Sequence, residues 1–389
     1  MLIPLIKLFK KKEQFEVIVI GLTTAAARLM QENISCYSYK DYLKLFPEEK
    51  VVECGKRLAG DSNNSGHVPY EESVAYLGIN YFELVETYGK DCAAELYRER
   101  GRGAFYPVES MKKILSSIGP DIVISTNSPR SEKATIEAAG KLKIPSVCLI
   151  DVFAFQSKSW IADNRFASKV CVLSNFVKQQ LVDEGRRETD VVVTGNPVFD
   201  KLTLYKKSFF RDRWGNAKRV ILWCSQVEPM THPFDNSRFG DPELPRNIEK
   251  HLFQIISDHD DWILILRPHP SECFSYGKLP YNVVVSDKSD DLHELIASVD
   301  IVITMTSTVA IEAALIGKPV VTVDLSIFTK DTPFSKMKLS KGVTDLNELE
   351  SLMEQLSLSA ESKNRVANIV GIPDDATKKI SKVIRDLLD

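Results

Sequence analysis

Two short polar segments each follow an apolar run, and their residue types suit phosphate chemistry. Residues 267–270 read RPHP and follow the run 262–266, whereas residues 306–308 read TST and follow the run 301–305. Arginine and histidine side chains can carry positive charge, and hydroxyl groups can donate hydrogen bonds. Both segments are therefore candidates for binding an anionic ligand.

The elements around the second segment favour a phosphate site. Residues 301–305 are apolar and β-branched, which indicates a buried parallel strand, and residues 309–316 form a helical pattern that stops at Gly317. The start of a helix offers unpaired N–H groups and a partial positive charge that attract phosphate. In open α/β sheets, ligands bind beyond the carboxyl ends of the strands. The RPHP segment follows a strand of the same unit and is predicted to lie on the same edge.

Each residue also has an ordinary structural interpretation. A hydroxyl residue such as Ser307 is often only a helix cap, a loop histidine such as His269 is often only solvated, and Glu312 could be a surface residue. Their combination on one edge favours a site, with the flanking prolines restricting the backbone at His269 and Glu312 within reach of ribose hydroxyls. The candidate donor-binding residues are Arg267, Pro270, Thr306, Ser307, Thr308 and Glu312.

Strand-like and helix-like segments alternate in two series, which predicts parallel sheets covered by helices. In the first series we expect strands at 16–21, 121–125, 145–150, 169–173 and 191–194, with helices at 24–32, 131–142 and 176–184. In the second we expect strands at 220–224, 262–266, 282–285, 301–305 and 320–323, with helices at 246–257, 291–297, 309–316 and a closing helix at 375–388. The predicted fold is α/β, with Rossmann-like, doubly wound domains at residues 1–203 and 204–389 that face a central cleft.

Three further segments stand apart from this alternation. Residues 58–106 and 227–245 are long insertions that could shape an acceptor site, and residues 206–219 form a basic linker. The N-terminus is apolar and then basic, and it is either a packed or disordered terminus or a weak membrane-surface contact. In the second case the contacting residues would be Leu2, Ile3, Leu5, Ile6 and Lys10 to Lys12.

Composition excludes several classes of protein. The chain has 389 residues and a formal net charge of -3, so no overall basic charge predicts a nucleic-acid partner. The seven cysteines include no C-x-x-C pair, which argues against a zinc site and a disulfide framework and fits the cytoplasm. No apolar run approaches the roughly 20 residues that a membrane-spanning helix needs.

The chain resembles the GT-B superfamily of nucleotide-sugar enzymes over most of residues 115–325. The resemblance lies in PDIVISTNSPRSEKATIEAAGKLKIPSVCLI, in VVVTGNPVFD at residues 191–200 and in the turn and helix from Thr306 to Glu312. The second of these segments looks like the one that closes the first domain in UDP-GlcNAc 2-epimerases. The third looks like their diphosphate- and ribose-binding element.

Within the superfamily, His269-Pro270 followed by Thr306 to Thr308 resembles the HP and Ser/Thr motifs of bacterial sialyltransferases and capsule Kdo transferases. RPHP also resembles the R-x-H-P motif of teichoic-acid polyol-phosphate transferases. The resemblance implies that His269 contacts the donor phosphate and supports the leaving group, while Ser307 and Thr308 hold the phosphate. It also implies a nucleotide-linked donor with CMP or CDP favoured over UDP, a glycan or glycolipid acceptor, and no metal or other cofactor.

The sequence departs from the epimerases after a strand of the first domain. Where they carry an H-x-E-A-G segment, this chain reads CLIDVF at residues 148–153. Asp151 ends the strand on the ligand edge and is the candidate general base, because an ionised carboxylate can accept a proton from an acceptor hydroxyl. The alternative for Asp151 is a helix cap or loop anchor, and the rival bases are Asp61, His67, Glu72 and Glu228.

These features predict a metal-independent glycosyltransferase that works in the cytoplasm or on the inner-membrane surface. The N-terminal domain would bind a surface-glycan acceptor and the C-terminal domain a nucleotide sugar, with a CMP-linked acidic sugar such as Kdo or a sialic-type sugar favoured. His269 and Asp151 are the expected catalytic residues. The alternatives are a UDP-GlcNAc 2-epimerase-like isomerase, a CDP-polyol phosphotransferase and a non-catalytic protein that binds nucleotide sugars.

Overall fold

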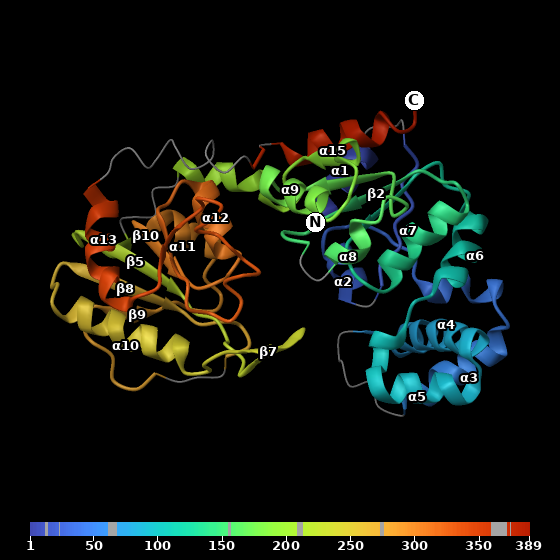
Figure 1. Ribbon diagram of the computed structural model, residues 1–389, viewed down its shortest axis with the longest axis horizontal. Helices are drawn as coiled ribbons and strands as arrows, with labels where there is room; N and C mark the ends of the chain where they lie inside the picture. Colours follow the sequence, from blue (N-terminus) through green and yellow to red (C-terminus); the bar gives the residue numbers. More distant parts are fainter. Residues whose placement is uncertain are drawn as a thin grey trace. The chain divides into compact units, whose positions relative to one another are not determined.

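The structure is a computed structural model of residues 1–389, and it forms two compact units. The first unit contains Met1–Leu173, Val177–Pro197 and Asp375–Asp389, and the second contains Ser174–Phe176 and Val198–Asp374. The residues described are 1–11, 15–22, 24–60, 68–154, 157–207, 213–272, 276–358, 372–373 and 375–389. Figure 1 labels the elements of both units.

The first unit contains a parallel four-stranded sheet in the order β1-β2-β3-β4. Its strands are β1 (Val123–Thr126), β2 (Ser146–Leu149), β3 (Lys169–Val172) and β4 (Val191–Val193). All four strands were expected from their apolar runs. Residues 16–21, where a strand was expected, are extended backbone with a single parallel bridge between Ile20 and Tyr37. The prediction of a regular strand there was wrong.

Helices cover both faces of this sheet and extend beyond it (Figure 1). Their bounds are α1 (Ile3–Lys11), α2 (Thr24–Gln31), α3 (Glu48–Ala59), α4 (Tyr70–Tyr88), α5 (Lys90–Arg100), α6 (Val108–Ile118), α7 (Ser131–Lys141), α8 (Lys158–Ile161), α9 (Asn175–Asp183) and α15 (Ala376–Arg385). The insertion at 58–106 is therefore mostly helical. Gly55 of α3 and Gly78 of α4 allow these two helices to pack backbone to backbone, because an added Cβ would collide with a carbonyl oxygen of the other helix.

The two ends of the chain pack together, which differs from the expected domain division. Leu5 and Phe9 of α1 join Ile380 and Ile384 of α15 in one buried cluster against β2 and β3. The closing helix was assigned to the second domain, but its apolar stripe belongs to the first unit. The division between the units also falls at Pro197 rather than at residue 203.

The same packing removes two residues from the suggested membrane contact of the N-terminus. The side chains of Leu5 and Ile6 are 2 % and 8 % exposed, so they are part of the protein interior. The exposed residues of α1 include Lys10 and Lys11, while Lys12 lies outside the described residues. Among the described residues, no helix is long and apolar enough to cross a membrane.

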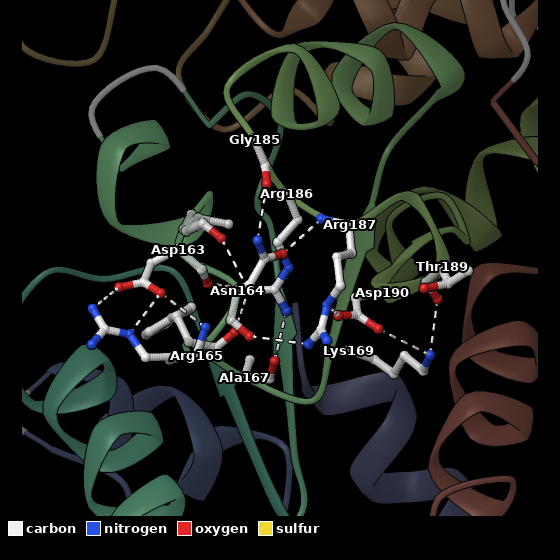
Figure 2. A network of polar contacts seen from close by, with 12 residues as sticks. Asp163, Asn164, Arg165, Ala167, Lys169, Gly185, Arg186, Arg187, Thr189 and Asp190 are labelled. Carbon is white, nitrogen blue, oxygen red and sulfur yellow. Dashed lines mark hydrogen bonds and ion pairs between the residues drawn. The ribbon is translucent and has the colours of Figure 1, made fainter.

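A buried arginine fixes the loop that leads from α8 to β3 (Figure 2). Arg186 is 2 % exposed, and its guanidinium donates to the carbonyl oxygens of Ile161 at 3.2 Å, Asp163 at 2.5 Å and Ala167 at 2.6 Å, and also to that of Phe166. Burial lowers the pKa of this arginine. The residue holds β3 and the chain before β4 in place through neutral acceptors.

The second unit contains a parallel six-stranded sheet in the order β12-β11-β10-β5-β8-β9. Its strands are β5 (Arg219–Cys224), β8 (Trp262–Arg267), β9 (Val283–Val285), β10 (Ile301–Thr304), β11 (Val320–Val323) and β12 (Lys341–Val343). Counted along the chain, this is the strand order 3-2-1-4-5-6 of a doubly wound Rossmann-like sheet. Five of these strands were expected, and β12 was not.

Helices α10 (Leu244–Ser257) and α13 (Leu349–Leu358) pack with the strands in a hydrophobic core around the buried Trp223 and Trp262. Helices α11 (Leu292–Ser298) and α12 (Val309–Ile316) pack against each other, and α12 also packs on β10 and β11. The insertion at 227–245 contains an antiparallel hairpin of β6 (Thr231–His232) and β7 (Asp235–Phe239). Of the expected basic linker at 206–219, residues 208–212 lie outside the described residues.

Candidate functional site

Three central strands of the second unit end side by side and carry polar residues there. In the sheet, Cys224 of β5 lies between Arg267 of β8 and Thr304 of β10. The strand order reverses between β5 and β10. The next strands in the chain, β8 and β9, lie on one side of β5, whereas β10, β11 and β12 lie on its other side. Ligands of doubly wound sheets bind at such a switch point, beyond the carboxyl ends of the strands. The candidate site therefore lies after Cys224 and Thr304.

Gln226 joins the two loops that leave this switch point. Its Oε1 accepts a hydrogen bond from the backbone N–H of Thr306 at 2.6 Å, and its Nε2 donates to the Thr306 hydroxyl at 3.3 Å. Thr306 is 8 % exposed, so its side chain is buried and bonds within the protein. These bonds give Thr306 a positioning role, and its expected part in donor binding stays a prediction.

The turn before α12 leaves polar groups available for a ligand. Ser307 accepts the N–H of Val309 at 3.3 Å, which is the local capping role that was the ordinary interpretation of this serine. Thr308 is exposed, and its side chain makes no capping hydrogen bond. Within the described residues, the backbone N–H groups of Ser307 and Thr308 have no acceptor. Two N–H groups and a hydroxyl thus surround the start of α12, as binding of an anion requires.

His269 lies in a tight turn directly after β8. Its side chain is exposed, and Nδ1 lies 2.6 Å from the hydroxyl of Ser271. Its backbone N–H donates to Glu272 Oε2 at 2.7 Å, and Pro270 is exposed beside it. A backbone bond from Ser225 N–H to the Arg267 carbonyl, 3.0 Å long, ties this turn to the end of β5.

Arg267 has partners that differ from the predicted phosphate. Its guanidinium donates to the carbonyl oxygens of Asp287, Lys288 and Asp290, the last two at 3.4 and 3.3 Å, and to the hydroxyl of Ser286 at 3.4 Å. These contacts hold the loop between β9 and α11. They give Arg267 a positioning role, and its expected role in donor binding stays a prediction.

Glu312 forms a pair with a histidine that sequence reasoning did not select. Its Oε2 lies 2.7 Å from His293 Nε2, which joins the first turns of α11 and α12. The hydrogen bond with Glu312 raises the pKa of His293 above its usual value. The ring of Tyr205 lies near, with centroids 5.3 Å apart. The carboxylate proposed for ribose is therefore held in one orientation and partly neutralised.

In the first unit, Asp151 follows β2 with an exposed side chain. Its backbone is fixed on both sides: its N–H donates to Asn127 Oδ1 at 3.1 Å, and its carbonyl accepts from Asn196 Nδ2 at 2.6 Å. The backbone is held from β1 and β4, as a loop-anchor role requires, while the carboxylate forms no hydrogen bond or ion pair with described residues. That arrangement is open to a role as a base.

The four alternative candidates for the general base are placed differently from Asp151. Asp61 and His67 lie outside the described residues. Glu72 is 4 % exposed, and burial raises its pKa. Burial also raises the pKa of Glu228, which accepts the N–H of Ile327 and the hydroxyl of Ser326 and so anchors a loop of the second unit.

Several site residues went unnoticed because their roles depend on distant partners. They are Ser225, Gln226, Arg246, Glu272 and His293. Ser225 and Gln226 had a usable signal, since they directly follow the buried run of β5. Among the described residues, no cluster of acidic, histidine or cysteine side chains has the arrangement of a metal site.

Comparison with known proteins shows which protein family the central part of the chain resembles. Residues 162–326 match the family model of UDP-N-acetylglucosamine 2-epimerase. Comparison with curated protein sequences gives no match. The chain therefore resembles this family over less than half of its length, in the part that contains β5, β8, β10 and the start of α12.

Solved structures of the same class match almost the whole chain. A UDP co-structure of MnaA from S. aureus has a TM-score of 0.59 at 15 % identity, covering 100 % of this chain and 93 % of that one. A putative UDP-N-acetylglucosamine 2-epimerase from Listeria monocytogenes gives 0.60 at 16 %, covering 99 % and 92 %. The Neisseria meningitidis UDP-GlcNAc 2-epimerase bound to UDP-GlcNAc gives 0.56 at 15 %, covering 99 % and 96 %. These similarities confirm the expected fold of two Rossmann-like units.

Proposed function

We propose that the protein is a nucleotide-sugar enzyme whose second unit binds the donor phosphate at the β5–β10 switch point. The observation that carries the proposal is the convergence of His269, Gln226 and the start of α12 on adjacent strand ends. The free N–H groups at the helix start and the exposed hydroxyl of Thr308 suit a phosphate oxygen. The match of residues 162–326 to an epimerase family that acts on a UDP-sugar supports the same assignment.

The first candidate reaction is glycosyl transfer. The acceptor oxygen forms a bond to the anomeric carbon of the sugar, the bond between that carbon and the phosphate oxygen breaks, and the departing nucleotide gains negative charge. Donors at the start of α12 and on His269 would stabilise that charge, which is usually the largest electrostatic contribution to such catalysis. Asp151 would accept the proton of the acceptor hydroxyl. A CMP-linked acidic sugar and a surface-glycan acceptor remain the proposed substrates. With a CDP-polyol as the alternative donor, the reaction would be a phosphotransfer, in which the acceptor oxygen bonds to the polyol phosphate, the diphosphate bond breaks and CMP leaves.

The second candidate is an isomerase that acts on a UDP-sugar. The family match and the fold shared with UDP-GlcNAc 2-epimerases favour it. It needs the same phosphate site but no acceptor. The segment at residues 148–153, which lacks the histidine and glutamate of the epimerase motif, favours transfer instead.

Calorimetry with UDP, CDP and CMP, followed by incubation with the matching nucleotide sugars, tests the proposal. Conversion of UDP-GlcNAc without an acceptor identifies the isomerase, whereas nucleotide release that requires a glycan acceptor identifies the transferase. We expect His269→Ala to lose turnover by roughly 100-fold or more while the circular dichroism spectrum is unchanged. Near-normal turnover in this variant, or no binding of any of the three nucleotides, contradicts the proposed site.

A further inference from the structure

The turn after β8 holds the backbone of His269 through a reciprocal pair of hydrogen bonds with Glu272. The His269 N–H donates to Glu272 Oε2 at 2.7 Å, and the Glu272 N–H donates to the His269 carbonyl at 2.8 Å. The prolines at 268 and 270 restrict the backbone on either side. The position of the His269 Cα is thus fixed by its own turn.

The ring of His269 is fixed as well, and the contacts define where its proton lies. The backbone N–H of Ser271 donates to Nδ1 at 3.2 Å, and the Ser271 hydroxyl lies 2.6 Å from the same atom. A backbone N–H can only donate, so Nδ1 must be the acceptor and carries no proton in the neutral ring. The proton of the neutral imidazole therefore resides on Nε2.

A second layer anchors this turn to the rest of the unit. Glu272 Oε1 pairs with the guanidinium of Arg246, and that guanidinium also donates to the Ser225 hydroxyl at 3.2 Å. Arg246 lies on α10 and also pairs with Glu249, which is 2 % exposed and accepts the indole N–H of Trp223 at 3.0 Å. The chain of contacts runs from the core of the sheet to the histidine turn.

We infer that this arrangement presents His269 as an electrically neutral N–H donor, with Nε2–H directed outward to a phosphate oxygen and Arg246 and Glu272 as positioning residues. The inference rests on the proposed function, since it names the bond that His269 makes to the donor phosphate. A donor that is fixed before the ligand arrives needs no reorganisation when charge develops on the leaving group.

Nitrogen-15 NMR of the wild-type protein at neutral pH tests the tautomer without any ligand. The signals of His269 are identified among the six histidines by their loss in His269→Gln. We expect Nδ1 to resonate as an unprotonated, pyridine-type nitrogen and Nε2 as a protonated, pyrrole-type nitrogen. A protonated Nδ1 in the neutral ring overturns the inference, whether or not a nucleotide binds.

Two isosteric variants test the direction of the donor. The amide N–H₂ of glutamine can occupy the place of Nε2, whereas that of asparagine lies near the place of Nδ1. Calorimetry with UDP, CDP and CMP should show that His269→Asn weakens binding by roughly 10- to 100-fold, as the loss of a hydrogen bond to a charged group does, and that His269→Gln weakens it much less. Equal losses in both variants, or a larger loss in His269→Gln, overturn the inference. No nucleotide binding by the wild-type protein contradicts the proposed function instead.

Variants of Glu272 test its positioning role through the tautomer of His269. Glu272→Ala removes the acceptor of the His269 N–H, and we expect NMR to show a mixture of His269 tautomers together with weaker nucleotide binding. Glu272→Gln keeps an oxygen that accepts the same bond, so it should restore the single tautomer. A pure Nε2–H tautomer in Glu272→Ala contradicts the role of Glu272.

Discussion

Arg186 of the first unit is buried, Arg246 of the second unit is half-buried with a side chain 17 % exposed, and the two arginines have different partners. Arg186 of the first unit donates to four main-chain carbonyl oxygens of residues 161–167. Arg246 of the second unit pairs with the carboxylates of Glu249 and Glu272. Neutral acceptors let a single arginine close a loop, whereas carboxylates let it connect a buried core group to an exposed turn.

Because of this difference, we expect a structural role for Arg186 and a role in ligand binding for Arg246. The segment held by Arg186 contains none of the candidate site residues, so its loss should affect the fold alone. Through Glu272, Arg246 reaches the turn that carries His269. Replacing each arginine with a methionine, which has a similar length but no donors, should therefore give different combinations of stability and binding.

The largest effect is expected for Arg186→Met. Three buried carbonyl oxygens and one part-buried carbonyl oxygen would lose their donor, and the free energy of unfolding should fall by roughly 3–5 kcal/mol. Urea denaturation measures this loss, and hydrogen exchange of residues 161–170 should accelerate locally. Arg187→Met is the matched control, because that side chain is 64 % exposed and donates to the carbonyl oxygen of Asn164 at 3.3 Å besides pairing with Asp190. Equal losses in the two variants would show that the buried carbonyl contacts are not the cause.

Arg246→Met should lower stability less but also weaken nucleotide binding. The variant leaves the carboxylate of Glu249 buried without a cation, at an expected loss of about 2–3 kcal/mol at neutral pH. Burial raises the pKa of Glu249, so the carboxyl group takes up a proton more readily in the folded protein. The deficit should therefore shrink as pH falls through the raised pKa, and grow as pH rises above it.

Urea denaturation at pH 5 and pH 8 measures this dependence, and calorimetry with UDP measures the binding. Glu249→Gln in the Arg246→Met background removes the uncompensated charge and should restore part of the stability without restoring the binding. Recovery of both would mean that Arg246 affects the His269 turn only through the stability of the fold.

The comparison also explains what the sequence could predict. The strands and the turn before α12 follow from apolar runs that end in polar residues, so the position of that turn beyond the strand ends could be predicted, while the ligand-binding role of Thr308 stays a prediction. Arg246 and Glu272 are 26 residues apart, and nothing in their local pattern indicates a pair. The strand expected at residues 16–21 has the apolar pattern but not the neighbouring backbone, because hydrogen bonding between strands is decided by the tertiary structure.

A smaller, pH-dependent effect is expected at His293 and Glu312. Because the pKa of His293 is raised by Glu312, the pair is stabilising at pH below the usual histidine pKa of about 6.5, and this contribution is lost as pH rises through the raised pKa. An uncompensated Glu312 would then repel a bound phosphate. We expect UDP affinity to fall by roughly 3- to 10-fold from pH 6 to pH 8.5.

Calorimetry at several pH values measures this decline. The relevant charged neighbours are Asp291, which also raises the pKa of His293, and Glu312 itself. His293→Gln should bind UDP with little pH dependence in this range, because its side chain does not titrate. Unchanged pH dependence in that variant assigns the effect to another group or to the ligand.

The smallest effect is expected at the surface pair beside Arg186. Arg165 pairs with Asp163 at 2.7 Å, and its hydrogen bonds lower the pKa of Asp163 to about 2. Arg165 is 91 % exposed, so solvent screens the interaction. We expect Arg165→Ala to leave the urea midpoint at pH 7 unchanged while the pKa of Asp163, followed by carbon-13 NMR, returns towards its usual value. Because Arg186 binds the main-chain carbonyl of Asp163 and not its carboxylate, a large destabilisation would mean that the side-chain pair, rather than the buried arginine, holds this loop.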